Sequence, residues 1–294
     1  MPVTGALRSS SVERSFPFVK GHGTENDFVL LPDLDGTVHP DLDPGTVRRL
    51  TNRHAGLGAD GVIRVVRSAD LADGRGIAAD AEWFMDYRNA DGSVAEMCGN
   101  GVRVIARYLW ESGLAEGSVL PVGTRAGVRT VHAGTDGSIT TEMGTPRPLT
   151  TGDRVLATSA GRTWPAEAVW VPNPHAVAFV DDLEDPGRLV RAPQLQPEQV
   201  FPRSANVEFV VGRGDGHIAM RVWERGVGET RSCGTGVCAA AWVAMRRDGA
   251  APGTSYIVDV PGGRLVVTER EDGELLLTGP AVLGLSGRVT LREL

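Results

Sequence analysis

Cysteine and lysine are both scarce in this chain of 294 residues. It has three cysteines, and Lys20 is its only lysine. So few cysteines, in an odd number, exclude a secreted scaffold held by several disulfides and favour a reducing cytoplasm. A pyridoxal cofactor needs a lysine for its Schiff base, so only Lys20 could carry that chemistry.

Long apolar runs and excess positive charge are also missing. No apolar run reaches the roughly 20 residues that span a bilayer, whereas an apolar fraction of 41% is enough for a globular core. A formal net charge of −7 disfavours nucleic acid as a partner. We therefore expect no membrane and no nucleic-acid partner. Residues 1–14 are expected to be a flexible leader, since they lack the apolar segment of a secretory signal.

No spacing typical of a metal or nucleotide site occurs. The six histidines and three cysteines show no zinc pattern, and the Walker, G-x-S-x-G and H-E-x-x-H motifs are missing. Residues 56–61 (GLGADG) match G-x-G-x-x-G, but a dinucleotide site needs a strand before this motif and a helix after it. Here the order is reversed, so we interpret the segment as a turn and expect neither a metal nor a cofactor.

Short β-strands are the abundant feature. Runs rich in Val, Ile, Thr and aromatic residues alternate with Gly, Asp and Pro. The expected strands are residues 28–31, 62–66, 83–87, 128–131, 139–143, 168–171, 176–180, 207–211, 218–223, 255–260, 264–268 and 275–277. Many short strands separated by turns predict sheets curled around a core.

Two longer segments have helical periodicity. Residues 98–112 place apolar side chains on one face and are followed by Gly113. Residues 233–247 are apolar on almost every side, as in a buried helix, and Cys238 within them is expected to be a core residue. A third helix is expected near 43–54. The stretch 145–167 is interpreted as a hinge and 184–204 as a surface loop.

Both long helices begin with the same short phrase, CGNGV at Cys98 and CGTGV at Cys233, 135 residues apart. A single copy would indicate a tight turn with a packing cysteine, but two copies favour a function. Glycines let the backbone approach a ligand, and the free N–H groups of a helix N-terminus bind a carboxylate. The helix dipole also favours a thiolate, so we expect thiol pKa values lowered from about 8.5 to roughly 3.5–7.5.

Two such thiols facing one carbon suit a particular reaction. One thiolate removes a proton, and the opposite thiol returns a proton from the other side. The N–H groups stabilise the charge that develops on the neighbouring carboxylate. The sequence thus predicts an acid–base enzyme that inverts a carbon beside a carboxylate.

The strings around these phrases resemble those of the diaminopimelate epimerases. Residues 89–103 (NADGSVAEMCGNGVR) and 223–236 (WERGVGETRSCGTG) resemble the two signatures of that family, and 21–28, 173–175 and 206–207 follow in its order. The resemblance spans residue 16 to about 290. It implies an α+β fold of two pseudo-symmetric lobes, each a curled, β-barrel-like sheet around a central helix, with the active site between them. The N-terminal lobe would be 15–145 plus about 281–294, and the C-terminal lobe 146–280.

The resemblance also implies an activity, the cofactor-independent interconversion of LL- and meso-2,6-diaminopimelate in lysine and cell-wall precursor biosynthesis. Cys98 and Cys233 would be the acid and base, and His175 an auxiliary residue that, with Glu224, sets their protonation. The substrate-binding residues would be Asn26, Asn89, Gly99, Asn100, Asn173, Asn206, Glu224, Arg225, Gly234 and Thr235. A homodimer is compatible with this family, although the sequence does not fix the number of subunits.

Two departures and two alternatives accompany the resemblance. Gly61 stands where many relatives have glutamine, and Thr235 where serine is common. One alternative is another racemase or isomerase of the same fold, for example one acting on proline or hydroxyproline, small cyclic substrates with no second carboxylate for Arg225. The other is a redox or binding protein in which Cys98 and Cys233 form a regulatory disulfide.

Overall fold

The computed structural model describes residues 14–39, 42–150 and 154–291. Within these ranges the protein is α+β, with many strands and three α-helices: α1 (Pro44–Thr51), α2 (Gly99–Glu111) and α3 (Gly234–Asp248). Short 3-10 turns lie at Ser68–Asp70, Arg75–Ile77 and Glu198–Val200. No helix of this described part is long and apolar enough to cross a membrane.

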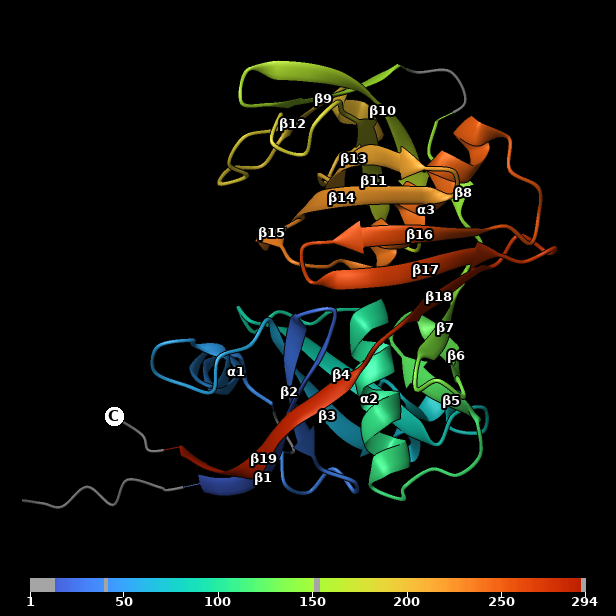
Figure 1. Ribbon diagram of the computed structural model, residues 1–294. Helices are drawn as coiled ribbons and strands as arrows, with labels where there is room; N and C mark the ends of the chain where they lie inside the picture. The colour runs from blue at the N-terminus through green and yellow to red at the C-terminus, as the bar shows by residue number, and fades with distance from the viewer. Residues whose placement is uncertain (1–13, 40–41, 151–153, 292–294) are drawn as a thin grey trace, which may run out of the picture.

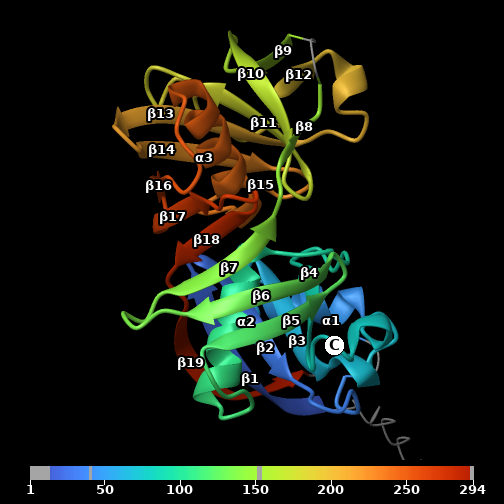
Figure 2. The same cartoon turned by 90° about the vertical axis from the view of Figure 1, so that its right-hand side faces the viewer.

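The strands form two curled lobes, each wrapped around one long helix (Figures 1 and 2). The N-terminal lobe, around α2, contains β1 (Arg14–Gly23), β2 (Asn26–Pro32), β3 (Gly61–Arg67), β4 (Trp83–Asn89), β5 (Val119–Thr124), β6 (Gly127–Ala133), β7 (Ile139–Gly144) and β19 (Val282–Leu291). The C-terminal lobe, around α3, contains β8 (Arg147–Pro148), β9 (Val155–Ser159), β10 (Arg162–Trp170), β11 (Pro174–Phe179), β12 (Gln194–Gln196), β13 (Asn206–Gly214), β14 (His217–Glu224), β15 (Gly228–Thr230), β16 (Ser255–Val260), β17 (Gly263–Glu269) and β18 (Leu275–Gly279).

The two lobes belong to one continuous sheet that does not close. Strand β7 of the N-terminal lobe pairs antiparallel with β18 of the C-terminal lobe, with Thr141 opposite Leu277. The chain then returns to the N-terminal lobe, where β19 pairs with β1 and Val289 lies opposite Phe16. The described part of the chain therefore starts and ends in neighbouring strands.

Each central helix fills the core of its lobe in a different way. Helix α2 turns Val102, Ile105 and Leu109 into the N-terminal core, and all three are fully buried. Helix α3 is buried on nearly every side, and its alanines Ala239–Ala241 let the surrounding strands approach closely. Positive φ angles at Gly113 and Gly249 mark the helix ends, as the sequence predicts.

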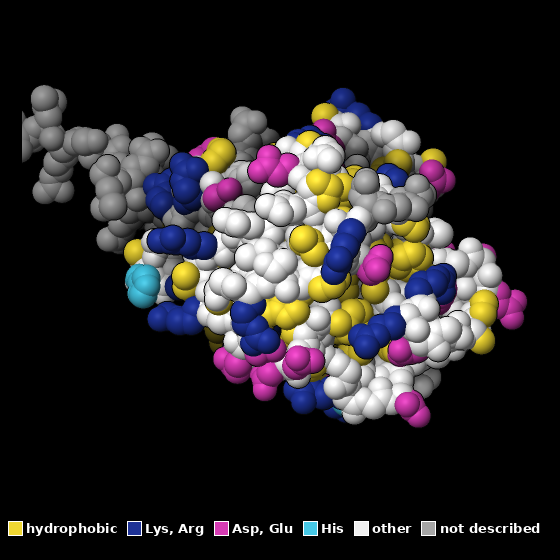
Figure 3. All heavy atoms as spheres, turned by 90° about the horizontal axis from the view of Figure 1, so that it is seen from above, with side chains coloured by type: hydrophobic (Ala, Val, Ile, Leu, Met, Phe, Trp, Pro, Cys, Tyr) yellow, Lys and Arg dark blue, Asp and Glu magenta, His cyan; other side chains and the backbone are white. Residues whose placement is uncertain are grey.

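Surface charge on the upper face carries both signs. Figure 3 looks down on the C-terminal lobe and shows acidic and basic side chains interspersed among small apolar groups, with no field of one sign.

Two expectations about the chain's organisation need correction. Residue 14 is not part of a leader, since Arg14 pairs with Leu291 in the β1–β19 ladder, while 1–13 lie outside the described residues. The hinge expected over 145–167 is also wrong for its second half, because β9 and β10 form a paired hairpin there, with Trp164 opposite Ala157. The chain crosses between the lobes in the short stretch from β7 to β8.

Candidate active site

A cavity of about 620 Å³ lies between the lobes, and Cys98 and Cys233, the first residues of the two repeated phrases, both line it. Nearly all of the residues expected at the site share these walls, with side chains from both lobes. They are Asn26, Asn89, Cys98, Gly99, Asn173, Asn206, Glu224, Arg225, Cys233, Gly234 and Thr235. The remaining two, Asn100 and His175, are fully buried and lie behind the lining.

The helix N-termini meet at this cavity. Cys98 is the N-cap of α2 and Cys233 the N-cap of α3, both with extended backbones that turn into the helix at the following glycine. A Cβ atom on Gly234 would lie only 3.2 Å from the Gly99 Cα. Because the two ends touch, their free N–H groups and the positive ends of both helix dipoles converge on one place.

Burial raises the pKa of both thiols, so the expectation of lowered values is wrong. Burial raises the pKa of Cys98 to about 12, although the N–H groups of Gly101 and Asn100 act in the opposite direction. Burial raises the pKa of Cys233 well above its usual range, and the nearby Glu224 and Glu208 carboxylates raise it further. The free energy needed to remove a thiolate from water thus exceeds the stabilisation that the helix N-terminus gives it. In this resting site both cysteines keep their protons, so the base must be generated locally.

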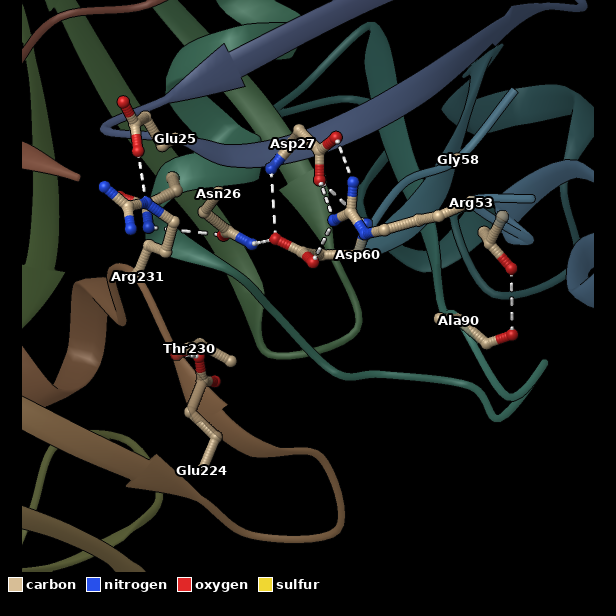
Figure 4. Close-up of polar contacts among 12 residues, drawn as sticks. Glu25, Asn26, Asp27, Arg53, Gly58, Asp60, Ala90, Glu224, Thr230 and Arg231 are labelled. Atoms are coloured by element: carbon tan, nitrogen blue, oxygen red, sulfur yellow. Dashed lines mark hydrogen bonds and ion pairs between the residues drawn. The ribbon is translucent and has the colours of Figure 1, made fainter. Parts of the chain in front are cut away.

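Glu224 is placed to take up the Cys233 proton. Its carboxylate is within hydrogen-bonding reach of the Cys233 thiol, and burial raises its pKa to about 7. Thr230 donates a hydrogen bond to the same carboxylate and fixes it in place (Figure 4). A carboxyl group poised near neutrality is suited to general acid–base exchange with the thiol.

Polar partners orient the asparagines of the C-terminal lobe. The Asn173 Oδ1 lies 2.6 Å from His175 Nε2, and the other ring nitrogen of His175 lies 2.7 Å from the Glu208 carboxylate. The Arg225 N–H donates to the Asn206 Oδ1 at 2.9 Å. Both amides therefore turn an oxygen toward the protein and leave their NH₂ groups available to a ligand.

The Arg225 side chain is exposed at the cavity and forms no ion pair with another residue in the described part of the chain. An unpaired guanidinium beside amide donors is a typical binding site for a carboxylate. In the N-terminal lobe, Asn89 donates to Ser93 Oγ at 3.0 Å and also faces the cavity.

Sequence reasoning missed four polar residues of the site. Asp60 and Tyr87 line the cavity, Glu208 lies behind His175, and Ser232 bonds to Thr24 across the two lobes at 2.7 Å. A single acidic residue in a loop or strand gives no periodic signal in the sequence. Of the four residues, only Ser232 could have been suspected, because it lies directly before Cys233. The Tyr87 ring also covers Gly61, where a Cβ atom would lie 2.4 Å from it.

The glycine-rich segment before β3 is a turn, as expected from its flanking elements. Lys20, the single lysine, is bonded to Asp27 and to the Gly58 carbonyl and does not line the cavity. Within the described ranges, no group of three His, Cys, Asp or Glu side chains is arranged to hold a metal ion.

Several known proteins of similar sequence are diaminopimelate epimerases. The sequence model of the family Diaminopimelate epimerase matches residues 18–149 and 168–284. A diaminopimelate epimerase of Streptomyces coelicolor is 56% identical over 275 residues, which cover 92% of this chain and 94% of that protein. One of Thermobifida fusca is 50% identical, covering 94% of this chain and 99% of that protein.

Solved structures of similar shape are more distant in sequence. A hydroxyproline epimerase of Agrobacterium vitis has a TM-score of 0.68 at 16% identity, covering 95% of this chain and 94% of that chain. A methylitaconate-delta-isomerase has a TM-score of 0.57 at 15% identity, covering 96% of each. These two likenesses show the two-lobed fold alone. The family match and the close relatives decide more: this chain belongs to the diaminopimelate epimerase family.

Proposed function

We propose that this protein is an isomerase that interconverts LL- and meso-2,6-diaminopimelate by a two-cysteine, cofactor-independent reaction. The observation that carries the proposal is the meeting of two cysteine-capped helix N-termini at one cavity, in a chain with close relatives of that name. The reaction belongs to the synthesis of lysine and of a cell-wall precursor.

The reacting end of the substrate has its carboxylate between the two helix ends. The N–H groups after Gly99 and Gly234 bind it, and each helix contributes roughly +0.5 of a charge. When the adjacent carbon loses its proton, the extra negative charge spreads onto this carboxylate. The converging dipoles then stabilise the transition state more than the ground state.

Proton transfer uses the two thiols in opposite roles. Glu224 accepts the proton of Cys233, and the resulting thiolate removes the proton from the substrate carbon. Cys98, still protonated, delivers its proton to the opposite face and inverts the centre. In the reverse direction the roles exchange. Acid–base groups positioned in this way contribute on the order of 10²–10⁴ each to the rate.

The far end of the substrate is an amino acid head with its own carboxylate. Arg225 and the NH₂ groups of Asn173 and Asn206 suit that carboxylate. Proline and hydroxyproline have nothing that reaches these groups, so this set favours the longer diamino diacid. Asn26 and Asn89 offer further amide contacts from the N-terminal lobe.

We extend the proposal to the setting of the enzyme. The mechanism requires reduced cysteines, so we place the enzyme in the cytoplasm. We divide the lobes near 145 and near 281, because β19 pairs with β1 rather than with the C-terminal sheet. A homodimer remains compatible with this arrangement.

The decisive experiment follows LL-diaminopimelate and L-proline, separately, in deuterated water. We expect epimerisation of the diamino diacid alone, with deuterium entering the new product before the recovered substrate, since separate thiols hold the two protons. Early equal labelling of substrate and product would contradict a two-base mechanism. Racemisation of proline without epimerisation of diaminopimelate would contradict the substrate.

Cysteine variants complete this experiment. Cys98→Ala should lower kcat by on the order of 10²–10⁴. Cys238→Ala is the matched control, because Cys238 is buried in α3 away from the cavity. It should keep the labelling pattern, with a stability loss of about 0.5–3 kcal/mol. A fully active Cys98→Ala variant would rule out the mechanism.

A further inference from the structure

A chain of hydrogen bonds runs through the N-terminal side of the site and has a fixed direction. The Arg103 Nη2 donates to Asn100 Oδ1 at 2.7 Å, and the Asn100 Nδ2 donates to Asn26 Oδ1 at 3.2 Å. The Asn26 Nδ2 then donates to Asp60 Oδ2 at 2.8 Å. Figure 4 shows the last part of this chain, from Asn26 through Asp60 to Arg53.

Charged groups at both ends set this direction. A guanidinium can only donate, so the oxygen of Asn100 must face Arg103. A carboxylate can only accept, so the nitrogen of Asn26 must face Asp60. Neither amide can turn over without placing two donors or two acceptors against each other.

Asp60 is itself held firmly. Arg53 Nη2 binds the Asp60 Oδ1 at 2.7 Å, and the Asp27 N–H donates to the Asp60 Oδ2 at 3.2 Å. Arg53 also binds Asp27 with both of its terminal nitrogens. The carboxylate that fixes Asn26 is therefore anchored by a cation and a backbone N–H together.

The consequence falls on Cys98. Its Sγ lies 3.6 Å from the Asn26 Oδ1, which is an acceptor and therefore receives the thiol proton. We propose that Asp60 is a positioning residue: it holds the Asn26 oxygen toward Cys98, where that oxygen accepts the thiol proton and favours the protonated form in which Cys98 acts as the proton donor when Cys233 is the base. A turned amide would offer N–H to the sulfur and favour the thiolate instead.

Other charged and titratable groups also act on this thiol. Arg103 on α2 and the N–H groups of Gly101 and Asn100 favour the thiolate, whereas Glu224 on β14 disfavours it. On β4, burial raises the pKa of the Tyr87 hydroxyl, and the charges of Cys98 and Asp60 raise it further. The Asp60 carboxylate could also act on Cys98 by its charge alone, and the test must separate that effect from the positioning of Asn26.

The role of Cys98 as donor depends on the proposed function, but its protonation can be measured without turnover. The probe is iodoacetamide at pH 8, with alkylation of each cysteine followed by mass spectrometry. In Asp60→Asn the new amide can donate as well as accept, so the acid end of the chain no longer fixes Asn26, and only the Asn100 amide still opposes a turn. We expect Cys98 to be alkylated about tenfold faster than in the wild type, the change that one unit of pKa produces.

A double-mutant cycle separates position from charge. Asn26→Leu removes the acceptor without a change in charge, and it should also speed Cys98 alkylation. In the Asn26→Leu background, Asp60→Asn should add less than about twofold, since no amide remains to be turned. An effect of Asp60→Asn that persists undiminished in this background would overturn the proposal, as would unchanged alkylation in either single variant.

The control is Asp73→Asn, at an acid of the same lobe that pairs with Arg125 and lies outside this cavity. It should leave Cys98 alkylation unchanged. Thermal unfolding of all variants shows whether each is folded. If Asp60→Asn does not fold, alkylation of the Asn26→Leu variant still tests the proposal. Failure of the alkylation test with intact epimerisation would reject the positioning role alone. A chain inactive on diaminopimelate that shows the alkylation pattern would reject the function alone.

Discussion

Glu224 shows how one half-buried side chain can serve both chemistry and stability. Burial raises its pKa to about 7, and the Thr230 hydroxyl and the Cys233 thiol oppose this shift without cancelling it. A carboxyl group with a raised pKa in the folded state binds its proton more tightly there than in the unfolded chain. The stabilisation that Glu224 contributes is fully present below the pKa that it has in the unfolded chain. It is lost as the pH rises through the pKa that it has in the folded protein.

The first prediction concerns Glu224→Gln. Between about pH 4.5 and 7 the wild type should lose stability relative to this variant, because only the wild type must ionise a buried carboxyl group. Above pH 7 the difference should stay constant. Urea unfolding at a series of pH values measures it. A difference independent of pH would contradict the raised pKa.

The cysteine pair could be predicted from the sequence, because a duplicated phrase at two helix starts is a strong local signal. Asp60 could not, since its importance comes from Arg53 and Asn26 folding against it. The direction of the thiol pKa shifts was predicted wrongly for a similar reason. A helix N-terminus is visible in a sequence, but the burial that outweighs it is a property of the assembled lobes.

Helices α2 and α3 depend on close backbone contact where they meet. Gly99 and Gly234 have no side chains there, and Leu277 packs beside both positions. Any side chain at this point must separate the two helix ends that the proposed function places around one carboxylate.

The second prediction is that Gly234→Ala lowers activity more than stability. The new Cβ would lie 3.2 Å from the Gly99 Cα and 3.3 Å from the Asn100 nitrogen. Small shifts of α3 would relieve this at about 1–3 kcal/mol, but they would misplace Cys233. Gly212→Ala, which has open space on β13, is the control. We expect kcat/KM to fall only for Gly234→Ala, and equal values for both would contradict the tight contact.

Element prediction succeeded where the local pattern was strong. Strand β16 alternates buried side chains with partly or fully exposed ones, and its predicted limits of 255–260 are those observed. Strand β19 was missed because its residues are mostly exposed and its partner β1 lies at the other end of the sequence. The β9–β10 hairpin was missed because Pro, Thr and Gly in 145–167 indicated a hinge.

At the scale of the whole molecule, several contacts join the two lobes. The β7–β18 ladder is one, and the meeting of the α2 and α3 N-termini is another. A third is the turn at Thr24 and Glu25, both with positive φ, which bonds to Ser232 and Arg231 of the C-terminal lobe. Asn26 follows this turn directly, so the position of one lobe is transmitted to a residue beside Cys98.

The third prediction tests this junction with Gly262→Ala. Its Cβ would lie 1.8 Å from the Thr24 carbonyl oxygen, so the turn must move away from the C-terminal lobe. We expect lower kcat, a raised KM and a lower unfolding temperature. Gly284→Ala on β19, with open space around it, should change neither kinetics nor calorimetric unfolding. A Gly262→Ala enzyme with wild-type kinetics would show that the junction does not position the site.

The β1–β19 ladder has a consequence for synthesis on the ribosome. The N-terminal lobe emerges first, yet its strand β1 stays unpaired on one edge until β19, which ends at Leu291, has been made. Until then β1 has a free edge, which can pair with other chains. The C-terminal lobe already has all its strands by then, so the part of the protein made first is completed last, and a chain truncated before β19 would leave that edge permanently open to aggregation.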